Sequence, residues 1–262
     1  MDIHRRRLPL VVIWQDSSSD DWFNSCQKSI IAMTNTAFIL PTLFIVTVIV
    51  TWTILYRAID APKFLWFLLL AWMPLQILLS ANGFYLNTTS MPPHFALAIG
   101  PPLFLIVYLS LLQRRMLVTN SSLKYLSLLH TVRIAVELVL LFLFQMGEIP
   151  KLMTFEGSNP DILSGITAPL VWLAYRKGLV GNSGLLVWNI VCLGSLLNIV
   201  VRAILSAPTP FQQFAFDRPN VGVLKAPYVL LPAFIVPAVL FSHVAAILKL
   251  SCGVVISLRD LR

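Results

Sequence analysis

The chain has 262 residues, of which 58% are hydrophobic and only 11% are charged, and its formal net charge is +8. An ordinary soluble domain carries roughly 25% charged residues, so this composition excludes a soluble globular protein. The basic residues are spread over several loops rather than gathered in a patch or a nucleic-acid-binding motif, so we expect no nucleic-acid partner.

Seven apolar stretches follow one another along the chain. They cover residues 30–56, 64–81, 95–112, 123–146, 162–175, 185–206 and 228–250. A helical span needs about 20 apolar residues. The fifth stretch is short, and a re-entrant or tilted helix covered by protein is the alternative for it. The pattern predicts an all-α fold, a polytopic transmembrane helix bundle of about seven spans embedded in a lipid bilayer.

The predicted organisation is an N-terminal tail over 1–29, a transmembrane helix bundle over 30–250 and a cytoplasmic C-terminal tail over 251–262. Disorder and an upstream extension are the two favoured interpretations of the tail. A signal peptide and a natural start at Met33 are the alternatives.

Lysine and arginine are distributed unequally between the two sets of span ends, and this predicts the orientation. Cytoplasmic loops are enriched in these residues, so the C-terminus is expected in the cytoplasm. The basic residues at His4 to Arg7 oppose this orientation only mildly, because they lie far from the first span. One side holds Arg57, Lys63, Arg114, Arg115, Lys124, Arg176, Lys177, Lys249, Arg259 and Arg262, whereas the loops of the other hold Lys151, Arg218 and Lys225.

The fourth stretch carries three ionisable residues on one helical stripe. His130, Arg133 and Glu137 follow the i, i+3, i+7 spacing of a single helix face. At about 1.5 Å per residue they extend over roughly 10 Å of depth. A charge exposed to hydrocarbon costs at least about 2.5 kcal/mol, so this face is expected to point at protein.

The sixth and seventh stretches add polar residues at matching depth. Counted from the outer ends, Arg202 lies about one turn from the level of Glu137, so an ion pair between them is within reach; Arg133, four residues before Glu137, is the other candidate partner. His243 falls near the level of His130. The predicted polar core of spans four, six and seven comprises His130, Arg133, Glu137, Asn189, Asn198, Arg202 and His243.

Three interpretations of this core remain open: a structural knot of hydrogen bonds and ion pairs, a ligand or ion pocket, and a site of chemistry. Two arginines against one glutamate leave an excess of positive charge, which favours an anion or a polar headgroup as the ligand. His130 and His243 at one level could also hold a haem through both axial positions. No other cofactor is expected. Metal-binding and nucleophile motifs are absent from the sequence, so we expect no metal site.

The two longer outer loops, 147–161 and 207–227, mix aromatic, amide and charged residues. They are expected either to fold back over the bundle as a lid with an acidic mouth, to which Glu148 also contributes, or to lie in the headgroup layer. The candidate residues of these loops are Glu156, Asp161, Gln212, Asp217 and Arg218.

The same loops carry a resemblance. The chain resembles an uncharacterised group of bacterial seven-span membrane proteins through the runs MTFEG at 153–157, DIL at 161–163, FQQFAFD at 211–217 and FSH at 241–243. The resemblance covers nearly everything after Met33. It implies a location in the bacterial inner membrane, and it assigns no activity and no site residue.

Three functions are consistent with these observations, and neither the choice among them nor the oligomeric state follows from the sequence. The first is binding or transport of a small polar or anionic molecule, which requires a cavity reaching Glu137. The second is a membrane-embedded enzyme acting on a lipid or quinone headgroup, which requires a lateral opening and an accessible His or Glu. The third is a structural subunit of a membrane complex, which requires a dry and fully paired interior.

Overall fold

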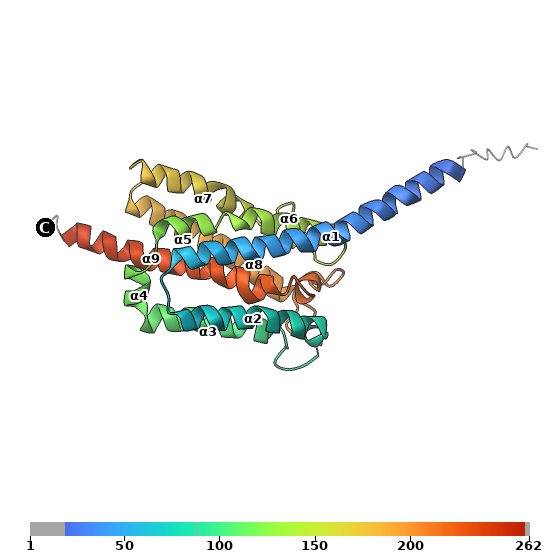
Figure 1. The fold of residues 1–262 in the computed structure, drawn as a ribbon, viewed down its shortest axis with the longest axis horizontal. Helices are drawn as coiled ribbons and strands as arrows, with labels where there is room; N and C mark the ends of the chain where they lie inside the picture. Colours follow the sequence, from blue (N-terminus) through green and yellow to red (C-terminus); the bar gives the residue numbers. More distant parts are fainter. Residues whose placement is uncertain (1–18, 88, 260–262) are drawn as a thin grey trace, which may run out of the picture. The chain divides into compact units, whose positions relative to one another are not determined.

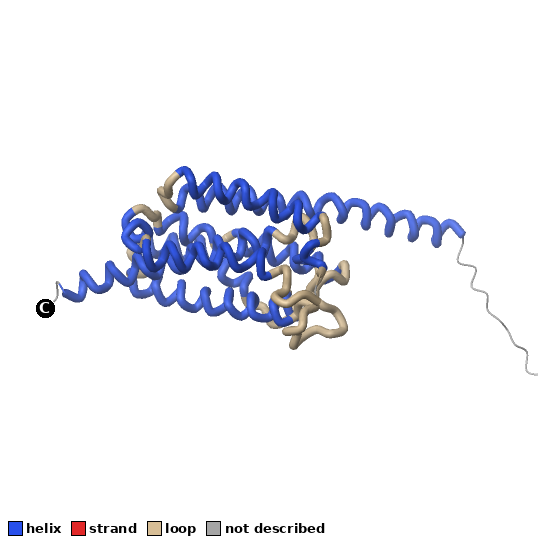
Figure 2. The backbone as a smooth tube through the Cα atoms, turned by 90° about the horizontal axis from the view of Figure 1, so that it is seen from below, coloured by secondary structure: helices blue, strands red, loops and turns tan. Residues whose placement is uncertain are grey.

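The computed structural model describes the backbone of residues 19–87 and 89–259 and the side chains of 38–87 and 89–252. The chain divides into two units, Met1–Ile39 and Leu40–Arg262. The described part is helical, with connecting loops and no strand (Figure 2). A single antiparallel bridge joins Ile59 to Ser121. The all-α prediction is therefore confirmed.

Within the first unit, helix α1 (Ser19–Ala58) already begins at Ser19, inside the segment expected to be a tail. Residues 1–18 lie outside the described residues. At the other end of the chain, helix α9 (Val236–Arg259) continues beyond residue 250, where we expected the last span to end.

The helices of the second unit follow the predicted stretches closely (Figure 1). Each stretch corresponds to one helix or to two consecutive helical segments. This unit contains the C-terminal part of α1 and the whole of α9. Its other helices are α2 (Lys63–Ala81), α3 (Ala96–Leu112), α4 (Arg114–Thr119), α5 (Leu123–Leu129), α6 (Val132–Gln145), α7 (Asp161–Arg176) and α8 (Asn182–Leu205). Short helical turns lie at η1 (Phe84–Leu86), η2 (Lys151–Met153), η3 (Gly222–Leu224) and η4 (Leu231–Ile235), the last a π-helical turn.

Five segments of the described chain are long and apolar enough to cross a membrane: Phe38–Ala58, Lys63–Ala81, Leu123–Gln145, Asn182–Leu205 and Leu231–Cys252. Helix α3 is apolar but has only 17 residues, and α7 has 16. The short fifth stretch expected from the sequence is thus α7. The apolar helices identify a membrane-inserted bundle, whereas the count of seven spans exceeds the five segments that reach full length.

Helix α9 is the centre of the second unit, because α3, α4, α5 and α8 all pack against it. About 67% of its span is buried inside the protein, and 61% of the span formed by α5 and α6, compared with 17% for α2. The two most buried spans are therefore also those that carry His130, Arg133, Glu137 and His243.

The span formed by α5 and α6 is interrupted at His130 and Thr131. The backbone N–H of His130 donates to the carbonyl of Ser127 at 3.3 Å instead of to that of Leu126, four residues back. The Leu126 carbonyl accepts the hydroxyl of Ser242 on α9 at 2.6 Å. Because a free carbonyl is costly at membrane depth, this bond from α9 stabilises the interruption.

A second irregularity lies where η4 leads into α9. Pro237 has no N–H, so the carbonyl of Ala233 loses its helical partner. The indole N–H of Trp72 on α2 donates to this carbonyl at 3.1 Å. Both central spans thus depart from regular helix, and π-helical turns and unwound turns of this kind are frequent near functional sites.

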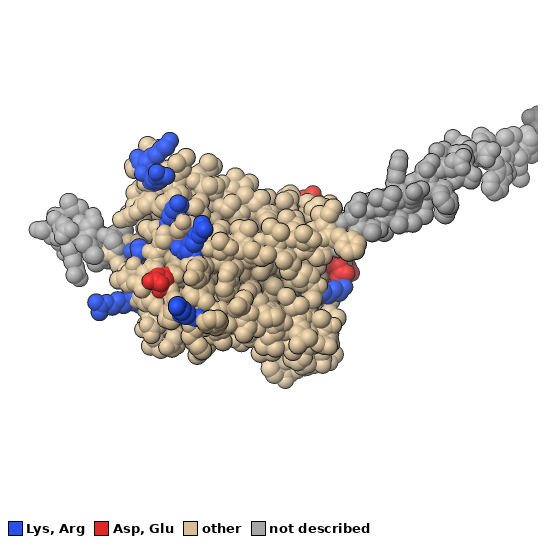
Figure 3. All heavy atoms as spheres, viewed as in Figure 1, with Lys and Arg blue, Asp and Glu red and all other residues tan. Residues whose placement is uncertain are grey.

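The charged side chains are distributed unequally over the second unit. Figure 3 shows most lysines and arginines gathered at one end, separated from the few charged groups at the other by a broad uncharged surface. The basic end contains the loops between α1 and α2, between α3 and α5, and between α7 and α8. This distribution matches the charge asymmetry expected from the sequence.

Candidate functional site

The buried core of the second unit is organised around an ion pair between Arg133 and Asp161. Both residues are almost inaccessible, at 2% and 5% exposure. The Nη2 of Arg133 donates to Oδ1 of Asp161, and its Nε donates to Oδ2 at 2.6 Å, which makes a bidentate pair. Ser195 Oγ donates to the same carboxylate at 2.9 Å, and the Cys192 carbonyl lies 3.3 Å from Nη2.

Close packing of α7 on α6 brings the two partners together. A Cβ added at Gly165 would lie 2.8 Å from Cγ1 of Ile134, so only a glycine lets α7 come this near. Asp161 lies one turn before Gly165 on the same face of α7. Its expected place in an outer acidic mouth is therefore wrong, because the first turn of α7 turns the carboxylate inward to Arg133.

The predicted ion pair between Glu137 and Arg202 does not form. Oε1 of Glu137 accepts the side-chain N–H of Asn159 at 2.5 Å, and Arg202 donates through Nε to Oδ1 of Asn198 at 2.9 Å. Counting residues along two helices gives the depth of a side chain but not the neighbour that it faces. Asn198 and Arg202 are half-buried, and Asn198 Nδ2 donates to the Ser158 carbonyl at 3.3 Å.

The loop between α6 and α7 supplies the missing partner of Glu137. Its residues Ile149, Met153 and Thr154 are fully buried, so the loop folds back into the bundle, as one of the two expectations for it stated. Asn159 also donates to the Met153 carbonyl at 3.1 Å, and its Oδ1 accepts the backbone N–H of Asp161 at 3.1 Å. Asn-Pro-Asp at 159–161 is a turn sequence ahead of an apolar helix, and this signal could have identified Asn159.

The histidines at the centre of the core are stacked on each other. The ring centroids of His130 and His243 lie 3.9 Å apart, with 20° between the ring planes. Asn189 Nδ2 donates to the Leu185 carbonyl, so its Oδ1 accepts from Nδ1 of His243 at 3.1 Å. Nε2 of His243 then accepts from Nη1 of Arg133 at 3.3 Å, which assigns the neutral tautomer protonated at Nδ1.

His130 and His243 do lie at one level, yet their arrangement does not fit a haem. Axial ligation requires the ring nitrogens to face each other across the iron, with the porphyrin between the rings. Two rings stacked face to face leave no room for it. Both ring nitrogens of His130 lack a hydrogen-bond partner among the described residues. In the same part of the chain, no three His, Cys, Asp or Glu residues are grouped to hold a metal ion.

A cavity of about 180 Å³ lies beside this core. Its walls come from α3, α6, α8 and the junction of η4 with α9, and Met153 and Val223 of the two outer loops also contribute. The lining is apolar except at Glu137 and Asp161. Oε2 of Glu137 has no hydrogen-bond partner among the described residues, although the backbone N–H of Phe155 lies near the same carboxyl group.

The rim of this cavity faces the side of the bundle. Leu103 of α3 and Leu197 of α8 line it and are 37% and 47% exposed. Helices α3 and α8 both pack on α9 but not extensively on each other, so the opening lies between them.

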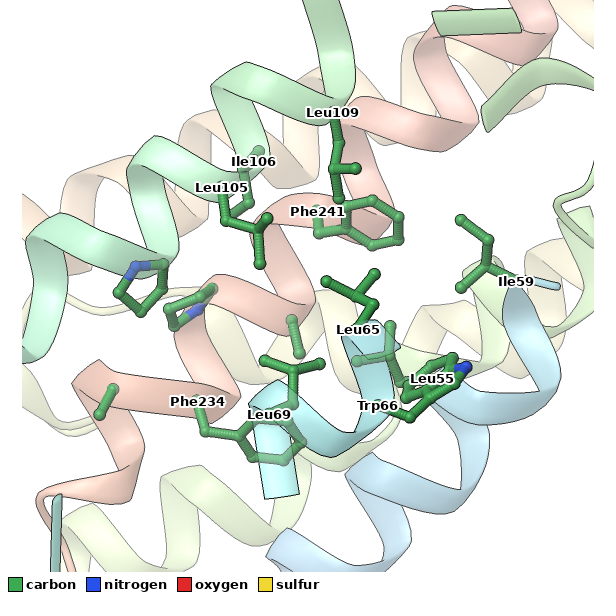
Figure 4. Close-up of a pocket in the computed structure, with 14 residues that line it drawn as sticks. Leu55, Ile59, Leu65, Trp66, Leu69, Leu105, Ile106, Leu109, Phe234 and Phe241 are labelled. Carbon is green, nitrogen blue, oxygen red and sulfur yellow. The ribbon is translucent and has the colours of Figure 1, made fainter. Parts of the chain in front are cut away.

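A smaller cavity of about 60 Å³ lies among α1, α2, α3 and α9 (Figure 4). Side chains such as Leu65, Leu105 and Phe241 point into it, and none of the residues that line it is ionisable. It therefore lacks the combination of apolar wall and carboxyl group that marks the larger cavity.

Two of the remaining outer-loop candidates, Gln212 and Arg218, hold the loops in place. Gln212 donates to the carbonyls of Phe214 and Ala215. Arg218 donates to the Phe144 carbonyl at 3.3 Å and lies over its ring. Glu148 pairs with Lys225, and Glu156 and Asp217 are exposed.

These features define an all-helical membrane protein with a neutralised polar core beside an apolar cavity. Residues 91–251 match the sequence model of a protein family described as Domain of unknown function (DUF8737), and the chain belongs to this family. No curated protein and no solved structure matches the chain. The matched region contains the ion pair, the histidine stack, both outer loops and all residues of the larger cavity.

Proposed function

We propose that this protein binds a molecule from the hydrocarbon phase of the membrane in the cavity between α3, α6, α8 and α9. One observation carries the proposal: an apolar cavity of about 180 Å³ is lined by Glu137, whose Oε2 has no hydrogen-bond partner among the described residues. An unsatisfied buried oxygen costs about 1–3 kcal/mol, and more when it is charged. A ligand that supplies a hydrogen bond at this point offsets that cost.

A purely structural role is less well supported. A structural knot is expected to be fully paired, as the Arg133–Asp161 pair is. Glu137 instead lies at the wall of an open volume with half of its carboxyl group unpaired. A binding or transport protein requires a cavity that reaches Glu137, and Glu137 is one of the residues that line this cavity.

The ligand expected from the sequence, a small polar or anionic molecule, is revised in this proposal. Its basis was an unpaired arginine, but Arg133 is neutralised by Asp161 in a bidentate pair. The ionisable side chains that line the cavity are acidic, and the rest of the lining is apolar. An apolar molecule with a limited polar end suits such a lining better than an anion.

A membrane-embedded enzyme is the second candidate, and the lateral opening between α3 and α8 favours it. Glu137 would act there as the proton carrier, since it lines the cavity. An enzyme would convert the bound molecule, whereas a binding or transport protein would release it unchanged. We further propose the bacterial inner membrane as the location and a cytoplasmic C-terminus, in accordance with the basic end of the bundle (Figure 3).

Filling the cavity tests the proposal. Ala203 of α8 lines the cavity, whereas Val201 on the same helix does not and is 51% exposed. Native mass spectrometry of protein released from mild detergent is expected to detect a retained small molecule in the wild type and in Val201→Phe. Ala203→Phe is expected to lose it while melting at a similar temperature. Equal retention in a folded Ala203→Phe variant, or no retained molecule in any form, would contradict the proposal.

A further inference from the structure

We infer that the smaller cavity, among α1, α2, α3 and α9, is part of a binding site for an anionic phospholipid. A segment of one acyl chain enters the cavity, and the phosphate headgroup lies among the basic residues at the near end of the bundle (Figures 3 and 4). The inference goes beyond the proposed function, because it concerns a different cavity and a different ligand. Its basis is the position of an apolar cavity directly beside positive charges that the described chain leaves uncompensated.

The helices that wall this cavity carry basic residues at the same end of the bundle. Arg57 of α1 lies between Leu55 and Ile59, which both line the cavity. Lys63 is the first residue of α2 and lies just before Leu65, another lining residue. The walls formed by α1 and α2 therefore both end in a cation.

Contacts at this end hold the basic segments together. The bridge between Ile59 and Ser121 joins the loop after α1 to the loop before α5. The Nζ of Lys249 on α9 donates to the Ser121 carbonyl at 2.5 Å. The Nη2 of Arg114, at the start of α4, lies 3.9 Å from Sγ of Cys252, also on α9. Cations from α1, α2, α4 and α9 are thus gathered around one end of the cavity.

The positive charge gathered there has little counter-charge within the described chain. Asp60 is the single acidic residue that the described loops of this end carry. Among the side chains that the structure describes, no carboxylate forms an ion pair with Arg57 or Lys63, which are both exposed. At the opposite end, by contrast, Lys225 is paired with Glu148. Because like charges repel one another, an anion from outside the chain stabilises the basic end.

The cavity is open between α2 and α3. Leu65, Trp66 and Leu69 of α2 and Leu105 of α3 line it and are only half-buried. Both helices pack on η4 but not extensively on each other. The lining residues of α2 lie in its first two turns, so the cavity begins within about 10 Å of the basic end. Its volume of about 60 Å³ admits only a segment of one chain.

An anionic phospholipid is the ligand that uses both parts of this site. A soluble phosphate ester would meet the cations and leave the apolar cavity empty. A zwitterionic phospholipid would fill the cavity but bring a quaternary ammonium group to the cations. A lipid with a net negative headgroup places charge and chain where the protein offers cations and an apolar wall, and each basic residue near such headgroups contributes about 1 kcal/mol.

Native mass spectrometry of the full chain in detergent, titrated with dioleoyl phosphatidylglycerol or dioleoyl phosphatidylcholine, tests the inference. We expect the wild type to bind the anionic lipid more tightly. The double replacement of Arg57 and Lys63 by Gln is expected to weaken its binding about 25-fold, at about fivefold for each cation removed. The matched control replaces Arg176 and Lys177 by Gln. It removes the same charge from the same end, but α7 does not line the cavity, so we expect a change of less than about twofold.

A pair of variants on α3 tests the part played by the cavity. Leu105→Trp fills the cavity and is expected to weaken phosphatidylglycerol binding. Val107→Trp adds the same ring on the same helix at a position that is 52% exposed and lines neither cavity, so it is expected to bind the lipid as the wild type does. If Leu105→Trp does not fold, the two double replacements at the exposed basic residues decide the inference.

Four results would overturn the inference: no binding of phosphatidylglycerol, equal binding of the two lipids, equal weakening by the two double replacements, or displacement of the lipid by an equal concentration of glycerol 3-phosphate. Equal weakening would mean that the basic end attracts the lipid as a whole, and displacement would mean that the site takes a soluble anion. Ala203→Phe fills the larger cavity and is expected to leave phosphatidylglycerol binding unchanged. Failure of this inference therefore leaves the proposed function standing, and loss of the lipid in Ala203→Phe would also contradict the assignment to the smaller cavity.

Discussion

Neutralising Asp161 tests the arrangement of the polar core directly. In Asp161→Asn the guanidinium of Arg133 keeps its position but loses its counterion in a site where both side chains are almost inaccessible. Breaking a buried ion pair from one side costs about 3–5 kcal/mol, because the remaining charge is uncompensated. The Cys192 carbonyl still accepts a hydrogen bond from Arg133 in this variant. We therefore expect the free energy of unfolding to fall by about 3 kcal/mol, the lower end of this range.

The partly exposed pair of Glu148 and Lys225 is the matched control. The side chains of Lys225 and Glu148 are 44% and 28% exposed, and such pairs contribute about 0–1 kcal/mol. Glu148→Gln is therefore expected to change the free energy of unfolding by less than 1 kcal/mol. Both values are measured by titrating the purified protein in mixed micelles with a denaturing detergent.

Two further variants complete this test. The double replacement of Arg133 by Met and Asp161 by Leu removes both charges, and we expect it to be more stable than Asp161→Asn alone. Glu137→Met leaves the Arg133–Asp161 pair intact, and Asn159 keeps its hydrogen bond to the Met153 carbonyl. The free energy of unfolding is therefore expected to fall by only about 1–2 kcal/mol. Equal stability of Asp161→Asn and Glu148→Gln would refute the assignment of Asp161 as the counterion.

Three other predictions concern topology, alkaline stability and the histidine stack. In a cysteine-free background, Ser158→Cys and Lys177→Cys are expected to react with an impermeant thiol reagent from opposite sides of the membrane, and labelling from one side contradicts the topology. Burial raises the pKa of Tyr85 to about 12. The folded state therefore holds this proton more tightly than the unfolded state, whose pKa is 10.0, and the free energy of unfolding is expected to fall by about 2 kcal/mol as the pH rises from 10 to 12. Tyr85→Phe removes that dependence, which denaturant titration at each pH measures. His130→Phe is expected to alter stability by less than 1 kcal/mol, because neither ring nitrogen has a partner in the described part of the chain, whereas His243→Phe severs two hydrogen bonds and is expected to cost about 1–3 kcal/mol. A larger loss for His130→Phe than for His243→Phe in the same denaturing-detergent titration contradicts this ranking.

Much of the core could be predicted from residue spacing alone. His130, Arg133 and Glu137 share one helix face, and the structure buries all three within the bundle. His243 lies at the level of His130, as the count along the spans predicted, and Asn189 binds it. These predictions succeed because the rise of a helix is constant and lipid excludes charged groups, so depth and sidedness follow from position in the chain.

The partners of these residues could not be predicted in the same way. Glu137 meets Asn159 instead of Arg202, and Arg133 meets Asp161, because the loop before α7 folds into the bundle and α7 packs closely on α6 at Gly165. The chain sequence alone determined an all-helical membrane bundle with a polar interior, through hydrophobic length and helical periodicity. Only the tertiary structure decided which charge is neutralised and where a cavity remains, because both depend on contacts between segments far apart in the chain.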